Sequence, residues 1–118
     1  MDRTLYSFTT KDSAVIDTIH PAVVRTLAFA AHGADIPEGT IVARNGSAAI
    51  VAYDPDGEAP VNVPVGVVVR TVYTADEAGD VLVHGCVFAE TLLVGDEAAA
   101  DADITALETN VAVYVTRS

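Results

Sequence analysis

The feature that most constrains the fold is a short segment, residues 61–72, in which seven of twelve positions are valine. Valine is β-branched, and the restricted rotation about its Cα–Cβ bond favours the extended backbone of a strand. The apolar run at residues 65–69 contains no polar side chain, as expected of a strand with both faces buried. Pro64 lacks a backbone donor, so it belongs at an edge, at a bulge or at the start of this strand.

A hairpin is predicted immediately before this segment. Two apolar runs, at residues 40–43 and 48–53, flank an Asn-Gly pair formed by Asn45 and Gly46. An Asn-Gly pair between two such runs is a strong short-range hairpin signal. The residues that follow, 54–60, have the composition of a loop.

Three other segments carry strand signals. Residues 81–90 indicate a strand that is bent or bulged at Gly85, and the alternation over residues 111–115 predicts a closing strand. Residues 22–31 are ambiguous, because their alanine, leucine and phenylalanine permit a helix whereas their β-branched residues favour a strand. We predict a strand there and keep a helix as the alternative.

The two ends of the chain differ from this strand-rich middle. A helix is predicted over residues 96–108, because acidic residues crowd its first turns, where the helix dipole favours negative charge. Asn110, just beyond it, can adopt the left-handed conformation that ends many helices. Residues 1–20 show neither the helical nor the strand period, and we interpret them as an extended N-terminal arm.

Length and composition place these elements in one domain. The chain has 118 residues, 51% of them apolar, and 39 of the apolar residues are alanine or valine. A chain of this size buries roughly two-thirds of its unfolded surface without the help of a disulfide or a metal, and Cys86 is the single cysteine. We therefore predict a mainly β protein, with a small β-sandwich or barrel-like body over residues 21–118 and one short C-terminal helix.

The charge of the chain excludes two classes of partner. Seventeen acidic residues outnumber six basic ones, and the net charge of −11 lies entirely in residues 33–118 because residues 1–32 balance to zero. Such an acidic body is repelled by phosphate backbones and by anionic membranes, so we expect neither nucleic-acid nor membrane binding. The N-terminus also lacks the basic-then-apolar order of a signal peptide, which predicts synthesis in the cytoplasm.

Residues capable of catalysis or metal binding do not form a recognisable set. His84 and Cys86 could share one face of a strand, but two ligands are too few for a structural zinc site. Asp54 and Asp56 begin like a calcium loop, yet the glycine comes too early and the late glutamate is missing. We expect a strand-edge histidine, a buried thiol and a plain turn, and we predict no enzymatic activity, metal or cofactor.

Two features point instead to protein binding. The arm carries Leu5, Tyr6 and Phe8 in a segment with no core of its own, and exposed aromatic residues in a polar tail are candidates for docking on another protein. Folding back onto the arm's own domain is the alternative. The valine-rich strands also have edges that must be covered, either by self-association or by the predicted helix.

Residues 21–24 (PAVV), 31–33 (AHG) and 37–42 (PEGTIV) form a predicted strand, a glycine turn and a glycine-led strand. Residues 64–69 (PVGVVV) and 83–92 (VHGCVFAETL) follow as two later strands, and residues 105–115 (TALETNVAVYV) as a helix that leads into a strand. The order and spacing of these segments resemble the lambda-type family of phage head-decoration proteins. Asn110 departs from the glycine commoner in that family, and residues 1–20 offer no motif to align.

The resemblance implies a β-tulip body that forms homotrimers and binds the major capsid protein on the outer surface of the expanded phage head. It also implies a non-enzymatic cementing role, in which the arm orders against the shell and helps it resist the pressure of packaged DNA. The candidate capsid-binding residues are then Leu5, Tyr6 and Phe8. The structural turn or cap positions are Gly39, Gly46, Gly66, Gly85 and Asn110. The alternatives are another structural β-module, such as a fibre or surface-layer component, and a small β-barrel ligand-binding protein.

Overall fold

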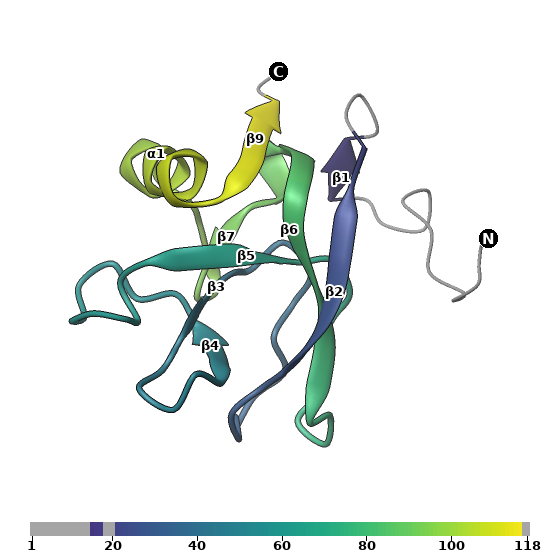
Figure 1. Ribbon diagram of the computed structural model, residues 1–118, viewed down its shortest axis with the longest axis vertical. Helices are drawn as coiled ribbons and strands as arrows, with labels where there is room; N and C mark the ends of the chain where they lie inside the picture. The colour runs from purple at the N-terminus through teal and green to yellow at the C-terminus, as the bar shows by residue number, and fades with distance from the viewer. Residues whose placement is uncertain (1–14, 18–20, 117–118) are drawn as a thin grey trace.

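The computed structural model describes residues 15–17 and 21–116, which form nine short strands, one α-helix and one 3-10 turn. In chain order these are β1 (Ile16–Asp17), β2 (Val23–Ala28), β3 (Ile41–Arg44), β4 (Ile50–Ala52), β5 (Pro64–Val68), β6 (Ala78–Phe88), the 3-10 turn η2 (Ala89–Thr91), β7 (Leu93–Val94), β8 (Glu97–Ala98), α1 (Asp101–Asn110) and β9 (Ala112–Thr116). Figure 1 shows their arrangement. The mainly β fold with one short helix is confirmed.

The eleven-residue strand β6 is shared by two halves of the main sheet (Figure 1). Its first half pairs antiparallel with β2 and β5. Its second half pairs antiparallel with β1 and parallel with β9. Gly85 lies in the second half with a φ of +138°, which other residue types rarely adopt, at the position where the sequence indicates a bend.

The first half of the sheet closes on itself like a barrel. The strands run in the order β2, β6, β5, β3 and β4. A single bridge between Phe29, just after β2, and Ile50 of β4 then joins the two ends, and the Ala30 N–H donates to the Ile50 carbonyl at 2.9 Å. The cluster of buried side chains in this half comprises Phe29, Ile36, Val42, Ile50, Val68, Val72 and Val81. The barrel-like body predicted from the sequence is therefore present.

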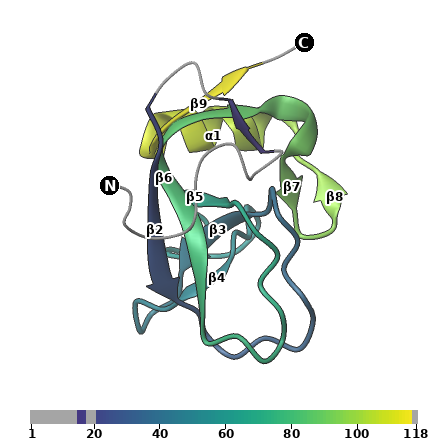
Figure 2. The same cartoon turned by 90° about the vertical axis from the view of Figure 1, so that its right-hand side faces the viewer.

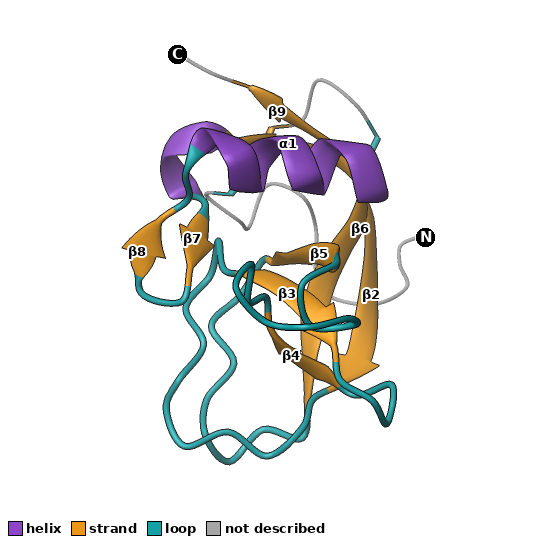
Figure 3. Ribbon diagram, turned by 90° about the vertical axis from the view of Figure 1, so that its left-hand side faces the viewer, coloured by secondary structure: helices purple, strands orange, loops and turns teal. Residues whose placement is uncertain are grey.

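Strands β3 and β5 are buried on both faces. Val42 and Val68 belong to the barrel cluster, whereas their neighbours Ile41 and Val67 belong to a second one. The second cluster comprises Val15, Ile16, Ile41, Ala43, Tyr53, Val67, Val69, Leu82, Val87, Leu92, Ile104, Leu107 and Val113. Figure 3 shows α1 and β9 above this part of the sheet. The predicted two-sided burial of residues 65–69 is confirmed, and Pro64 begins β5, where its register with β3 shifts.

The strand predictions for the remaining segments agree with the structure. Residues 22–31 contain β2 and the Phe29 bridge, so the strand prediction was correct and the helix alternative was wrong. The hairpin around Asn45 and Gly46 joins β3 to β4, with Arg44 opposite Ile50. β6 begins at Ala78, earlier than the sequence indicates, because its first three residues, 78–80, pair with Ala28, Leu27 and Thr26 of β2.

The helix prediction needs two corrections. The helix begins at Asp101, not at residue 96, because the chain turns at Gly95 (φ +64°) and residues 93–98 form the β7–β8 hairpin. Asn110 is the last residue of the helix and has no positive φ, so the predicted left-handed cap is wrong. Its side-chain amide instead donates to the Ala106 carbonyl at 2.8 Å, which lets Val111 continue directly into β9.

The predicted boundary of the arm also differs from the structure. Val15 and Ile16 lie in the second cluster with exposures of 1% and 4%. Ile16 pairs with Val87 of β6, and the Phe88 N–H donates to the Val15 carbonyl at 3.0 Å. Residues 15–17 therefore belong to the body, because β6 extends past the end of β2 and leaves a free edge that β1 covers (Figure 2).

Gly39 occupies a position that only glycine fits. Its φ is +92°, its N–H donates to the Val68 carbonyl at 2.7 Å, and its carbonyl accepts from the Leu93 N–H at 2.9 Å. A Cβ at this position would overlap the Thr91 carbonyl oxygen. Gly39 thus fixes the junction between β5 and the segment that leads to α1. Gly66 is similarly close to β6, since a Cβ there would lie 2.6 Å from the Leu82 carbonyl oxygen.

We predict that Gly39→Ala lowers the free energy of unfolding by about 2–4 kcal/mol. Alanine would be strained in the left-handed backbone conformation of this position, and its Cβ would overlap the Thr91 carbonyl oxygen. Gly33→Ala is the matched control, since Gly33 has no positive φ and no atom lies within 4 Å of the place that its added methyl group would take. Its effect should stay within about 0.5 kcal/mol. Urea unfolding followed by circular dichroism measures both, and equal midpoints for the two variants would contradict the assignment.

The β3–β4 hairpin generates a second prediction, because its left-handed residue is Ala48 (φ +67°) and not Gly46. Ala48→Gly should raise the free energy of unfolding by about 0.5–1 kcal/mol through relief of this strain. Gly46→Ala should not destabilise the protein, since no atom lies within 4 Å of the added methyl group. Thermal unfolding of both variants tests this, and a lower melting temperature for Ala48→Gly would refute it.

Candidate interaction surfaces

The structure does not bring His84 and Cys86 together as a reactive pair. Cys86 is 5% exposed, and its Sγ lies 3.2 Å from the Thr116 hydroxyl of β9. His84 is exposed on the same strand, one residue before the unusual backbone of Gly85. Within residues 15–17 and 21–116, no group of three or more potential metal ligands occurs. The buried thiol expected from the sequence is confirmed. The strand-edge position expected for His84 is wrong, because β6 has β2 on one side of His84 and β9 on the other.

The acidic loop after β4 is an ordinary turn. The Asp54 carboxylate accepts from the Asp56 N–H at 3.0 Å, and the Asp54 carbonyl accepts from the Gly57 N–H at 3.1 Å. The Asp54 N–H in turn donates to the Val61 carbonyl at 3.0 Å, which closes the loop. These bonds account for the Asp-Pro-Asp-Gly sequence by local hydrogen bonding alone.

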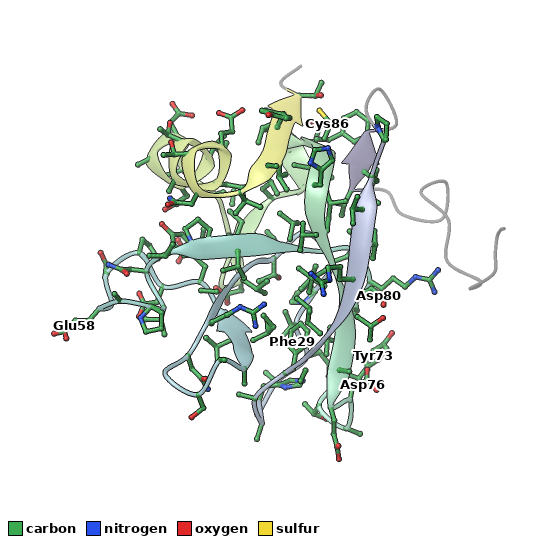
Figure 4. The ribbon with its side chains drawn as sticks, in the orientation of Figure 1. Phe29, Glu58, Tyr73, Asp76, Asp80 and Cys86 are labelled. Carbon is green, nitrogen blue, oxygen red and sulfur yellow. The ribbon has the colours of Figure 1, made fainter. Side chains whose placement is uncertain are left out.

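The far end of the barrel presents an ordered surface, which we call the tip and define as residues 30–37 and 72–77. Ile36 and Val72 join its two segments through a pair of backbone hydrogen bonds of 2.8 Å each. The Asp35 carboxylate accepts from the Thr74 N–H at 3.1 Å. Tyr73 projects from this surface and is 58% exposed (Figure 4). The tip therefore holds an exposed aromatic ring on a hydrogen-bonded backbone.

His32 ties the same two segments together by its side chain. Its Nδ1 lies 3.0 Å from the Ala30 carbonyl oxygen, and its Nε2 lies 2.9 Å from the Tyr73 carbonyl oxygen. The bond to Ala30, followed by the bond to Tyr73, raises the pKa of His32, and the carboxylates of Asp35 and Asp76 add to this while partial burial opposes it. These neighbours thus stabilise the charged form of the ring relative to that of a free histidine side chain.

A cavity of about 520 Å³ lies beside the tip. Its apolar lining includes Ala30, Ile36 and Ile50, and its polar lining includes His32 and Asp35. The walls come from one tip segment, from β4 and from the β7–β8 turn. Most of the lining is apolar, and the cavity by itself specifies no reaction.

A second exposed surface lies at the opposite end of the molecule, where β2, β6 and β9 pair side by side. Val23, His84 and Ala112 face one another in register across the three strands, and Tyr114 lies two residues further along β9. All four are exposed, Val23 at 46% and Tyr114 at 53%. We call these four residues the upper sheet face. It combines apolar and aromatic groups without a carboxylate, unlike most of the acidic body.

The exposed aromatic residues of the described body are not the residues predicted from the sequence to bind a partner. Leu5, Tyr6 and Phe8 of the predicted arm lie outside the described residues. Gly39, Gly46, Gly66, Gly85 and Asn110 lie at the turns, strands and helix end described above. Tyr73 and Tyr114 were missed as exposed aromatics. Tyr114 alternates with buried Val113, so its exposure could have been inferred from the strand period. Tyr73 carries no comparable signal, because its exposure depends on how the tip folds.

Comparison with known proteins gives no further guidance: no protein-family model matches the chain, and neither does any curated protein. In the part of the chain that the structure describes, no helix is long and apolar enough to cross a membrane. The two surfaces are therefore assigned from the residues and geometry above.

We predict that the Cys86 thiol reacts with a thiol-specific dye about 10³-fold or more slowly in the native protein than in urea, if its exposure requires global unfolding. The reason is its burial among β1, β6 and β9. Absorbance on dye release gives both rates. His84→Ala should leave the native rate unchanged, and a slower rate in that variant would instead indicate a nucleophile activated by His84.

Proposed function

We propose that this protein is a non-enzymatic decoration protein that binds, as a homotrimer, the outer surface of an expanded phage head. Its partner is the major capsid protein, and its role is to strengthen the shell against the pressure of packaged DNA. The protein is made in the host cytoplasm and acts on the virion. Each molecule contributes a modest contact, and many copies on one shell add these contacts into a large total.

The single observation that carries this proposal is the order of the family-like sequence segments along the fold. The segments beginning at Pro21, Pro37 and Pro64 lead into β2, β3 and β5. The segment over residues 83–92 covers the second half of β6 and the turn η2, and residues 105–115 cover the second half of α1 and most of β9. The resemblance thus runs through both halves of the body, and not through one isolated motif.

The chemistry of the described body fits a binding role better than a catalytic one. The His32 ring bonds two carbonyls, and the Cys86 thiol is buried against Thr116. The acidic loop at Asp54 is satisfied by its own backbone. Exposed apolar side chains, in contrast, gather on the upper sheet face, as in surfaces that contact another protein.

Charge also supports attachment through a protein surface. The whole net charge of −11 resides in residues 33–118, and the N-terminal 32 residues carry none. An acidic body is repelled by the DNA inside a shell, whereas an electrically neutral segment can approach a protein surface without electrostatic cost. The upper sheet face lies close to β1, where the arm joins the body.

We predict that deleting residues 2–14 leaves the body folded and weakens binding to expanded heads. The deletion ends at residue 14 because a deletion of residues 2–17 would also remove Val15 and Ile16 from the core. The longer deletion should lower the free energy of unfolding by about 3–6 kcal/mol, from the burial of two large aliphatic side chains. Co-sedimentation with expanded phage heads stripped of their own decoration protein measures binding, and urea unfolding measures stability.

The same assay contains its controls. Unexpanded heads should bind little of the full-length protein, because the proposed site spans several capsid subunits in their final arrangement. Light scattering of the free protein should give three times the 12.2 kDa of one chain. Equal binding to unexpanded heads, full binding by the 2–14 deletion, or open filaments in place of trimers would each count against the proposal.

A further inference from the structure

The hydrogen bonding of His32 depends on its own protonation. A carbonyl oxygen only accepts hydrogen bonds, so the Ala30 and Tyr73 carbonyls each need a proton on the ring nitrogen that faces them. A neutral imidazole has one N–H and one lone pair, and it can therefore satisfy one of the two carbonyls. An imidazolium has two N–H groups and satisfies both.

The two carbonyls belong to segments that are distant in sequence. Ala30 lies where the barrel closes, and its own N–H donates to the Ile50 carbonyl. Tyr73 begins the turn into β6, in which the Asp76 N–H donates to the Tyr73 carbonyl at 2.9 Å and the Tyr73 N–H donates to the Asp76 carboxylate at 2.8 Å. His32 thus adds a side-chain tie to the Ile36–Val72 bridge and the Asp35–Thr74 bond.

We propose that His32 is a pH-dependent clasp of the tip, which joins the Ala30 and Tyr73 segments when its ring is doubly protonated and loosens the Tyr73–Asp76 turn when one proton leaves. The other ties between the two parts of the chain are the Ile36–Val72 bridge, the Asp35–Thr74 bond and the backbone bond from the Phe29 N–H to the Glu77 carbonyl at 2.9 Å. His32 differs from them because the hydrogen-bonding capacity of a histidine ring changes near neutral pH. The Ile36–Val72 bridge persists, so the change is a local opening of the turn. This inference does not depend on the proposed function.

The charged groups around the ring all favour the closed clasp. Asp35 faces it from its own segment and Asp76 from the opposite turn, and both raise the pKa of His32. Asp96, from the β7–β8 turn, lines the same cavity. On the remaining side the ring meets Phe29 edge to face, with centroids 6.2 Å apart. The neighbouring charges are therefore carboxylates, which stabilise an imidazolium.

The direction of the pH effect follows from the raised pKa. A group with a higher pKa in the folded than in the unfolded protein stabilises the fold fully below its unfolded pKa, which is about 6.5 for histidine. That contribution is lost as the pH rises through the folded pKa. The clasp is therefore closed at mildly acidic pH and opens as the pH rises through the raised pKa of His32, and its opening loosens the support of the exposed Tyr73 ring.

The test is amide hydrogen exchange on the full chain at pH 5.5 and pH 8.5, read at Thr74 and Asp76 by NMR and corrected for intrinsic exchange. Wild-type protein should be protected roughly two- to tenfold more than His32→Ala at pH 5.5, the range of one ordinary hydrogen bond. The ratio of the wild-type to the His32→Ala protection factor should fall towards one at pH 8.5. His32→Gln, which keeps a donor but does not titrate, should give the same protection at both pH values.

Two controls make the outcome decisive. His84→Gln removes the exposed histidine of β6 and should reproduce the wild-type ratio at both pH values. The nitrogen chemical shifts of the His32 imidazole should show a doubly protonated ring at pH 5.5. Their pH dependence should give a pKa above that of histidine in a blocked peptide. An exchange ratio that is the same at both pH values, or a neutral His32 ring at pH 5.5, would overturn the clasp.

Discussion

The burial of β3 and β5 on both faces is the constraint on which the rest of this structure depends. Ile41, Val67 and Val69 pack towards α1, while Val42 and Val68 pack into the barrel. A strand in this position needs apolar side chains at every residue, and fully burying one such side chain contributes about 1.5–3 kcal/mol. Two layers must therefore form around one small sheet, one by barrel closure and the other by the helix and β9.

β6 connects these two layers because it is longer than any one of its partners. β2 covers one edge of its first half, and β1 takes over that edge in the second half. On the other edge β5 is succeeded by β9, which runs parallel to β6. The parallel pairing requires a crossover, and α1 provides it while covering the second cluster. Both α1 and β9 thus follow from the need to cover the second half of β6.

The surfaces left by this arrangement lie at the two ends of β6. At one end the tip is held by backbone bonds and by His32, and it presents Tyr73. At the other end the upper sheet face presents Val23 and Tyr114. Neither surface could be predicted fully from the sequence, because each combines residues from segments that pairing brings together. His32 and Tyr73, for example, are 41 residues apart, and no local pattern relates them.

By itself the sequence determined the strand class, the hairpin at Asn45 and the two-sided burial of residues 65–69, because β-branching and turn chemistry act over a few residues. Tertiary structure decided where the helix begins, how Asn110 ends it, and that Val15 and Ile16 join the body. The physical reason is the same in each case. The edges of β6 need hydrogen-bond partners, and the uncovered face of β5 needs apolar side chains packed against it. The segments that meet these needs are the ones that can reach them in the folded chain, and local propensity does not specify which these are.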